Sequence, residues 1–182
     1  MSIADPSPPR RVSYEVPLLD ALRESIADLR IMTYSGQGRA NKFGISGWHL
    51  PTNQHFQFGD LRVELPSATV VVETESAGGV GNLVKYWPLL QEGILTKPLV
   101  LFHVYMLGSS GDYIAHRTLW SFLLERMTED LMARGIVRPD QWDAELATYP
   151  KGGSTADVAT SFRRLVLEAI GERHRQIDRS PV

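Results

Sequence analysis

The chain of 182 residues contains no cysteine, which excludes disulfide bridges, thiolate metal sites and cysteine nucleophiles. It also has no apolar run close to the roughly 20 residues that a helix needs to cross a bilayer. The segment Met1–Arg11 lacks the hydrophobic stretch of a signal peptide. These absences predict a soluble, cytoplasmic protein that makes no membrane contact.

The chain also has little net charge, because 19 Lys and Arg residues stand against 21 Asp and Glu residues. A protein that binds polyanions over its whole surface is normally basic, so any contact with nucleic acid must come from a local patch. Hydrophobic residues make up 43% of the chain and charged residues 22%. This composition is typical of a globular domain with a sizeable core and excludes a disordered chain.

The order of patterns along the chain predicts an α/β fold with a mixed sheet. Residues 1–17 contain four prolines and are expected to form an extended lead-in. Residues 18–108 are expected to form the core, with a helix from 18 to about 34, strands at 47–50, 54–65 and 68–75, a helix over 83–90 and a nearly all-apolar strand at 98–106. Residues 109–182 are expected to be a C-terminal helical segment packed on that core, with helices over 114–133, around 142 and over 155–175.

The two strands that flank Pro66-Ser67 are predicted to pair in one register. A symmetric reversal places Leu61 opposite Val72 and makes one face of the pair wholly apolar, as a half-buried hairpin requires. The same register places Asp60 opposite Glu73 on the other face, with Glu75 two residues farther along the same side. Three carboxylates are therefore expected at one end of the pair.

Acidic side chains that face each other repel, so this cluster needs a physical reason. A divalent cation converts the repulsion into coordination, and carboxylate and water ligands suit Mg²⁺. We therefore predict that Asp60, Glu73 and Glu75 bind Mg²⁺ or Mn²⁺. The alternative is that the three residues form the solvated face of an edge hairpin.

A glycine-rich loop, Gly78–Gly81, follows these acids and precedes a helix for which Asn82 is the expected N-cap. A strand, a glycine loop and a helix N-terminus form an anion-binding arrangement, although the Gly-Lys-Ser/Thr ending of a Walker A loop is missing. Lys85 falls in the first turn, where a cation opposes the helix dipole. Because the helix starts just beyond the carboxylates, we expect Lys85 to reach the same site.

Asp60, the triplet Glu73-Thr74-Glu75 and the order helix, three strands, helix, strand resemble the PD-(D/E)xK nuclease superfamily. The resemblance covers residues 18–106 and implies a restriction-endonuclease-like core. Glu75 stands where lysine is usual in this superfamily, and Gly59 stands where proline is usual. Some members carry a second Glu at the first of these positions, and others supply the lysine from the following helix, which matches Lys85.

The resemblance implies Mg²⁺-dependent hydrolysis of DNA phosphodiester bonds. In this scheme Asp60 and Glu73 hold the metal, Glu75 binds a metal or orients the water, and Lys85 stabilises charge that develops on the phosphate. The candidate contacts to DNA are the basic or polar side chains nearby, which are Arg39, Lys42, Arg62 and Asn82.

Two alternatives stay open at this stage. The chain could be a catalytically degenerate nuclease fold that serves as a DNA-binding or assembly subunit, or an α/β protein whose glycine loop binds a nucleotide or another anion. A homodimer or a larger complex is expected, with the helices after Asp112 as its surface. His103 is expected to be a satisfied core residue, whereas participation of His49, His55 or Glu24 in the site is left open.

Overall fold

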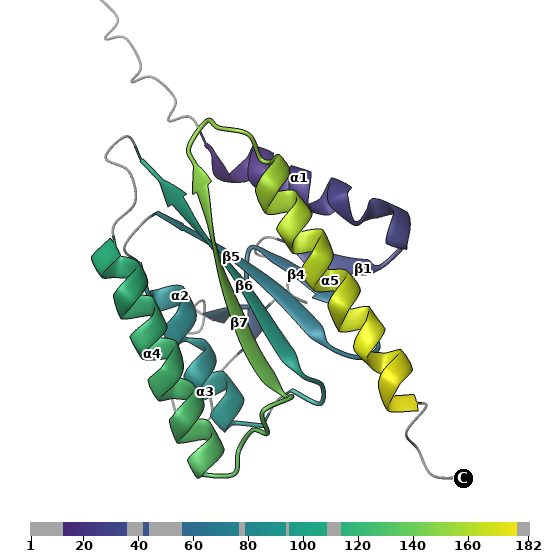
Figure 1. The fold of residues 1–182 in the computed structure, drawn as a ribbon, viewed down its shortest axis with the longest axis vertical. Coiled ribbons are helices and arrows are strands. Elements are labelled where there is room, and N and C mark those ends of the chain that lie inside the picture. Colours follow the sequence, from purple (N-terminus) through teal and green to yellow (C-terminus); the bar gives the residue numbers. More distant parts are fainter. Residues whose placement is uncertain are drawn as a thin grey trace, which may run out of the picture.

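The computed structural model describes residues 13–35, 42–43, 56–76, 79–93, 95–108 and 114–177, without the side chains of residues 35, 76 and 172–177. They form three layers, with a sheet between two layers of helices (Figure 1). Helices α1 (Glu15–Ser25) and α5 (Ala156–Ile177) cover one face of the sheet. Helices α2 (Gly81–Val84), α3 (Tyr86–Gln91) and α4 (Ile114–Ala133) cover the other.

The sheet has five strands in the order β1-β4-β5-β6-β7. Strands β1 (Met32–Ser35), β4 (Leu61–Glu64) and β5 (Thr69–Ser76) pair antiparallel, whereas β6 (Leu99–Leu107) and β7 (Trp142–Pro150) continue the sheet in parallel with β5. The short strands β2 (Lys42–Phe43) and β3 (Phe56–Gln57) form a separate antiparallel pair. The predicted α/β class and the mixed sheet are confirmed.

The predicted register of β4 and β5 is confirmed. Leu61 pairs with Val72 and Val63 pairs with Val70, and all four side chains are buried. A hydrogen bond of 2.9 Å from the Leu65 N–H to the Ala68 carbonyl closes the connection. Apolar matching across one face therefore sets this register, as expected of a strand pair with one face in a core.

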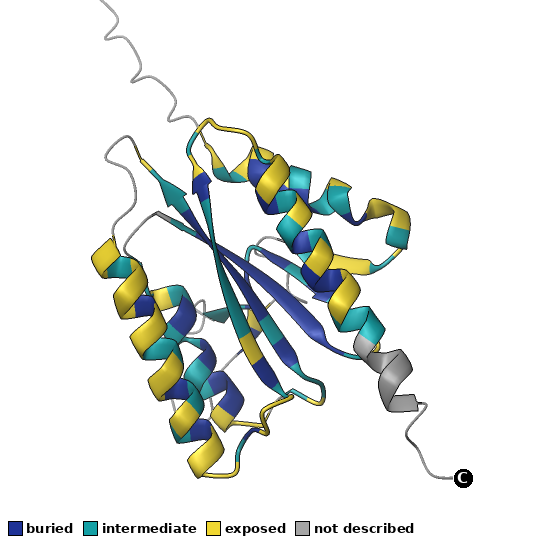
Figure 2. Cartoon of the chain, in the orientation of Figure 1, coloured by how far each residue is buried: buried dark blue, intermediate teal, exposed yellow. Residues whose placement is uncertain are grey.

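Each face of the sheet has its own hydrophobic core. Alternate residues of β4, β5 and β6 pack against α1 and α5 on one side, and the intervening residues of β5 and β6 pack against α2, α3 and α4 on the other. The central strands are accordingly buried along most of their length (Figure 2). Within the described part of the chain, no helix is both long and apolar enough to cross a membrane.

The first predicted helix is too long, and the first strand of the sheet was missed. Helix α1 ends at Ser25, a 3-10 turn follows, and Arg30 takes a left-handed conformation at φ 53° that turns the chain into β1. Thr33 and Tyr34 favour strands and pair with β4, which overrides the helical pattern before them. The strand predicted at 47–50 lies outside the described residues.

Helix α5 fixes the position where α1 ends. The guanidinium of Arg163 donates a hydrogen bond to the Ser25 carbonyl and forms an ion pair with Asp28. The Ser67 hydroxyl at the β4–β5 turn also donates to the Ala169 carbonyl of α5 at 2.8 Å. Helix α5 therefore contacts both the end of α1 and the β4–β5 turn.

The helix predicted around Trp142 is wrong, because Trp142–Pro150 is strand β7. The segment WDAELATYP contains Ala, Glu and Leu, which favour helices in isolation. Parallel pairing with all nine residues of β6 overrides that preference. Residues 109–182 therefore complete the sheet as well as adding the predicted helices, which the structure places at α4 and α5.

The helix predicted over 83–90 is two short helices that meet at Lys85. Pro88 explains the break, since a residue without an N–H is tolerated only in the first turn of a helix, and a new helix starting at Tyr86 puts it there. Asn82 is not the N-cap as predicted. It lies inside α2, which follows Val80 and has no side-chain cap.

The predicted strand 54–65 is interrupted by Gly59, which has φ +66°. A Cβ at this position would lie 2.5 Å from the Val72 carbonyl oxygen. Gly135 offers a matched control, because it has φ +67° and no heavy atom within 4 Å of the same hypothetical Cβ.

We expect Gly59→Ala to lower the free energy of unfolding by about 2 kcal/mol more than Gly135→Ala, because only Gly59 adds a clash to the strain of a left-handed backbone. Urea unfolding of both variants measures the difference. Equal losses of unfolding free energy in the two variants would show that the backbone around residue 59 shifts enough to relieve the clash with Val72.

Candidate active site at the ends of strands β4 and β5

Asp60 lies directly before β4 and is held by β5. Its backbone N–H donates to the Val72 carbonyl at 2.8 Å. Its Oδ2 accepts hydrogen bonds from the Thr74 N–H at 2.7 Å and from the Thr74 hydroxyl at 2.8 Å. Two donors on one oxygen fix the carboxylate at the end of the β4–β5 pair, because charge-assisted hydrogen bonds are the strong ones.

Glu73 lies on the opposite side of β5 from Thr74, under α2 and α3. Its side chain is only 2% exposed. Its Oε1 accepts a hydrogen bond from the Tyr86 hydroxyl and forms an ion pair of 2.5 Å with the Lys85 ammonium. Burial raises the pKa of Glu73 to about 7 although Lys85 and Tyr86 both oppose that rise. This carboxyl therefore exchanges its proton near neutral pH.

Lys85 reaches the site from the junction of α2 and α3. Its ammonium contacts Glu73 and, at 3.3 Å, the side-chain oxygen of Asn82. The break between the two helices allows this, because Lys85 ends one helix and directly precedes the other. Its side chain is only 13% exposed, so most of the ammonium's hydration is replaced by these two partners.

Glu75 is bound to the start of the same helix pair. The backbone N–H and the side chain of Asn82 both hydrogen-bond its carboxylate, while partial burial raises its pKa. The carboxylate lies so close over Gly79 that a Cβ there would be 2.0 Å from the Glu75 Cδ. The Glu75 carboxylate therefore lies against Gly79, at the loop where the sequence predicted that an anionic ligand would bind.

Glu15, the first residue of α1, also belongs to this cluster and was missed in the sequence. Its carboxyl hydrogen-bonds the Thr74 side chain, and burial together with the charge of Asp60 raises its pKa. An acid in the first turn of a helix is the signal that could have drawn attention to it. Glu24, the other acidic candidate on α1, is exposed and lies nine residues farther along the helix, roughly 13 Å by the rise of a helix.

The cluster carries a surplus of negative charge. The charge of Asp60 contributes to raising the pKa of Glu15, Glu73 and Glu75, so all three glutamates are within electrostatic reach of Asp60, and Lys85 is the cation that acts on Glu73 and Glu75. A hydroxyl has one hydrogen, so Thr74 cannot donate to Asp60 and Glu15 at once. An added proton or cation would relieve both conflicts.

A metal ion is a chemically suitable counter-charge, with a restriction on its ligands. Among the described residues, no group of three or more acidic or histidine side chains is placed to hold an ion. Mg²⁺ is usually held by only one or two carboxylates together with water and substrate phosphates. Asp60 and Glu73 fit that pattern, whereas Glu75 is engaged by Asn82.

The predicted DNA contacts are only partly brought to this site. Arg62 lies against the rings of Tyr34 and Phe58, at 4.6 and 5.1 Å, and pairs with Glu64 at 3.2 Å, so it supports the packing of β4. Asn82 binds Glu75 and Lys85 as described above. Lys42 is exposed on β2, whereas Arg39, His49 and His55 lie outside the described residues.

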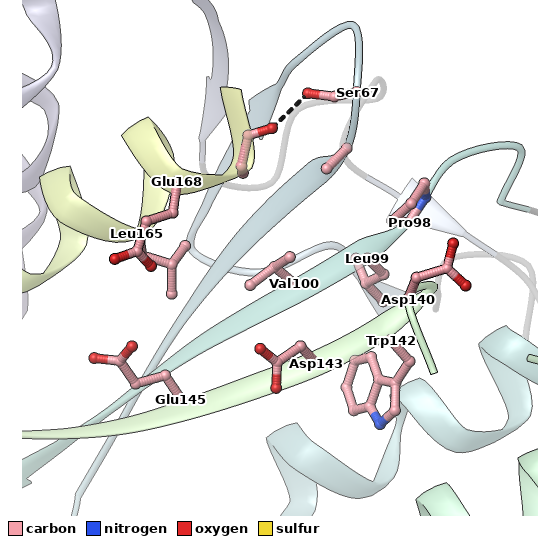
Figure 3. Close-up of a pocket in the computed structure, with 12 residues that line it drawn as sticks. Ser67, Pro98, Leu99, Val100, Asp140, Trp142, Asp143, Glu145, Leu165 and Glu168 are labelled. Carbon is pink, nitrogen blue, oxygen red and sulfur yellow. Dashed lines mark hydrogen bonds between the residues drawn. The ribbon is translucent and has the colours of Figure 1, made fainter. Parts of the chain in front are cut away.

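A cavity of about 140 Å³ lies elsewhere, between α5 and the first residues of β6 and β7 (Figure 3). Its lining includes Asp140, Asp143, Glu145 and Glu168. Arg164 pairs with both Glu145 and Glu168, at 2.9 and 3.0 Å, and neutralises part of this charge. None of the predicted site residues lines it, so this cavity is distinct from the Asp60–Glu73 cluster.

No protein-family model matches the chain, and neither the curated proteins nor the solved structures contain a match to it.

Proposed function

We propose that this chain is a nuclease-like protein that hydrolyses DNA phosphodiester bonds with Mg²⁺, in a site of the PD-(D/E)xK type. One observation carries the proposal. A lysine from the helices after β5 contacts Glu73 on β5, while the acid at the start of β4 is fixed beside them by Thr74. This arrangement matches the variant of the superfamily pattern in which the lysine comes from the helix after the third strand.

The topology supports the same proposal. Apart from the separate β2–β3 pair, the elements follow one another along the chain as helix α1, the antiparallel strands β1, β4 and β5, helices α2 and α3, and the parallel strand β6. This is the order of a restriction-endonuclease-like core, with Met32–Ser35 as the first strand in place of the predicted residues 47–50. Strand β7 and helices α4 and α5 extend the core.

The residues have distinct chemical roles in this proposal. Asp60 and Glu73 would hold Mg²⁺, which when bound lowers the pKa of a water molecule and polarises the phosphate. Lys85 supplies positive charge where negative charge develops on the phosphate. Thr74 holds Asp60 and Tyr86 holds Glu73, so that both carboxylates meet the substrate already oriented.

A second candidate is a degenerate nuclease fold that binds DNA or assembles a complex without cleaving. The contacts at Glu73 are compatible with this candidate, because Lys85 and Tyr86 both bind Glu73 Oε1 and hold the carboxylate in place without a substrate. A nucleotide in the glycine loop is disfavoured, since Glu75 covers Gly79. The two nuclease-fold candidates differ in one measurable property, which is cleavage.

The chain offers a matched pair of lysines for the test. Lys85 pairs with Glu73 at one end of the β4–β5 pair, and Lys97 pairs with Glu64 at the other end, at 2.7 Å. We expect the wild type to cleave DNA with Mg²⁺ or Mn²⁺ and to lose cleavage in EDTA. We expect Lys85→Met to lower kcat by about 100-fold, as loss of one charge-stabilising donor does, and Lys97→Met to keep the wild-type rate.

Cleavage is measured on linear and supercoiled DNA, with single-stranded DNA and RNA as parallel substrates. DNA binding without cleavage by the wild type would favour the degenerate subunit. Equal rates for Lys85→Met and Lys97→Met would remove Lys85 from the reaction.

A further inference from the structure

His103 is a buried histidine next to the candidate site, and it has none of the roles assigned in the proposed reaction. It lies in the middle of β6, is 0% exposed, and stands in register with Glu73 on the neighbouring strand β5. Adjacent parallel strands lie about 4.8 Å apart, and paired residues point to the same face. The imidazole therefore lies on the side of the sheet that carries Glu73, below α4.

The hydrogen bond from Trp120 determines the protonation state of one ring nitrogen of His103. The indole N–H of Trp120 on α4 donates to Nδ1 at 2.9 Å. Because an indole nitrogen can only donate, Nδ1 must be the unprotonated nitrogen, and a neutral ring then carries its hydrogen on Nε2. Burial, together with the charge of Lys85, lowers the pKa of His103 to about 3, so the ring is neutral in the working pH range.

This assignment restricts what His103 can do. A metal ligand needs a free lone pair, and the only one is already taken by Trp120. His103 is therefore a donor, and its Nε2–H points to a place where an acceptor is required. That atom is fully buried and has no hydrogen-bond partner among the described residues. A buried donor without an acceptor loses its hydration with nothing in return, and such groups in proteins are commonly satisfied by ordered water.

Two charged side chains that could hold such a water molecule neighbour His103. The Glu73 carboxylate is the register neighbour on β5, and both of its assigned partners, Lys85 and Tyr86, bind the same oxygen. The Lys85 ammonium is close enough to disfavour protonation of the His103 ring. A water molecule there would have a donor, an acceptor and a cation around it, as buried waters require.

We propose that the Nε2–H of His103 donates a hydrogen bond to a buried water molecule that also bonds to the Glu73 carboxylate, which makes His103 a positioning residue of the candidate site. The hydrogen bond from Trp120 keeps the His103 hydrogen on Nε2. The Nε2–H then holds the water molecule, and the water molecule orients the Glu73 carboxylate through its own hydrogen bond. The role in catalysis rests on the proposed nuclease function, whereas the water site does not.

The water is tested first, by an atomic-resolution crystal structure of the full chain. We expect an ordered water molecule within hydrogen-bond distance of both His103 Nε2 and a Glu73 oxygen. Long-range proton–nitrogen NMR spectra should show a neutral ring protonated on Nε2. A ring protonated on Nδ1, or a well-defined map without that water, overturns the inference whether or not the protein cleaves DNA.

Two conservative variants then separate positioning from packing. His103→Gln can place an amide N–H near the position of Nε2, whereas His103→Asn reaches only far enough to accept the bond from Trp120. We expect His103→Asn to lower kcat about tenfold with KM for DNA unchanged, which is a loss typical of residues that orient metal ligands. The kcat of His103→Gln should stay within about threefold of the wild-type value, because its amide can still donate.

The crystal structures of the same two variants give a second readout, in which the water should remain in His103→Gln and be lost from His103→Asn. Equal kinetic losses in both variants would show that His103 only fills space. A wild type that does not cleave but holds the water would refute the nuclease proposal and leave the water site standing.

Discussion

Asp60→Asn is expected to lose Mg²⁺-dependent cleavage of DNA, with kcat falling on the order of 1,000-fold, because a metal-binding charge is removed from the proposed site. The fold should survive, since an amide oxygen can still accept the hydrogen bonds from the Thr74 N–H and hydroxyl. Single-turnover cleavage and thermal unfolding monitored by circular dichroism measure the two effects separately.

Asp143 provides the control for this substitution. Its carboxylate also accepts a backbone N–H, from Ala144 at 2.8 Å, but it lines the acidic cavity away from the cluster. Asp143→Asn should therefore cleave at the wild-type rate. If Asp60→Asn kept that rate as well, Asp60 would have no part in the reaction and the nuclease proposal would lose its metal ligand.

Glu73 is expected to make the stability of the fold depend on pH. Its folded-state pKa of about 7 is above the ordinary value of 4.5, so the folded chain holds this proton more tightly than the unfolded chain does. The free energy of unfolding therefore decreases as the pH rises from about 4.5 to about 7 and then levels off. Between pH 5 and pH 8 this group alone should remove about 2 kcal/mol.

Glu73→Gln should abolish that part of the pH dependence, because the amide resembles the protonated carboxyl at every pH. The comparison is between the slopes of two profiles, since Lys85 loses its ion-pair partner in the variant and the absolute stability changes as well. Urea unfolding at a series of pH values gives both slopes. Glu129→Gln, which removes an exposed acid that pairs with Arg126 on α4, should follow the wild-type profile. Parallel profiles for Glu73→Gln and the wild type would contradict the assignment of the raised pKa to Glu73.

The parts of the fold that could be predicted are those in which one local pattern has a single good solution. The β4–β5 register follows from apolar matching of Leu61 with Val72 and of Val63 with Val70. Strand β7 could not be predicted, because its own residues favour a helix and only pairing with β6 makes them a strand. Strand β1 was hidden for a similar reason, since no glycine or proline separates it from α1.

The candidate site was predictable where charge follows register and not where it depends on contacts between distant segments. The contact between Lys85 and Glu73 needs only one strand followed by one helix start. The predicted pairing of Asp60 with Glu73 on one face is not found, because the Asp60 carboxylate bonds Thr74, whose side chain lies on the other side of β5. Glu15 reaches Thr74 from α1, which covers the opposite face of the sheet from α2 and α3. The bond between His103 and Trp120 likewise depends on how α4 packs on β6, which no local pattern contains.

The pairing of α5 with α1 has a consequence for biosynthesis. Leu18 and Leu22 of α1 share one core with Val158 and Phe162 of α5, and Arg163 ties the two helices together. A nascent chain leaves the ribosome from its N-terminus, so this side of the sheet stays open to water until α5 has emerged. We therefore expect ribosome-bound intermediates to be sensitive to proteases and to recruit chaperones until α5 docks.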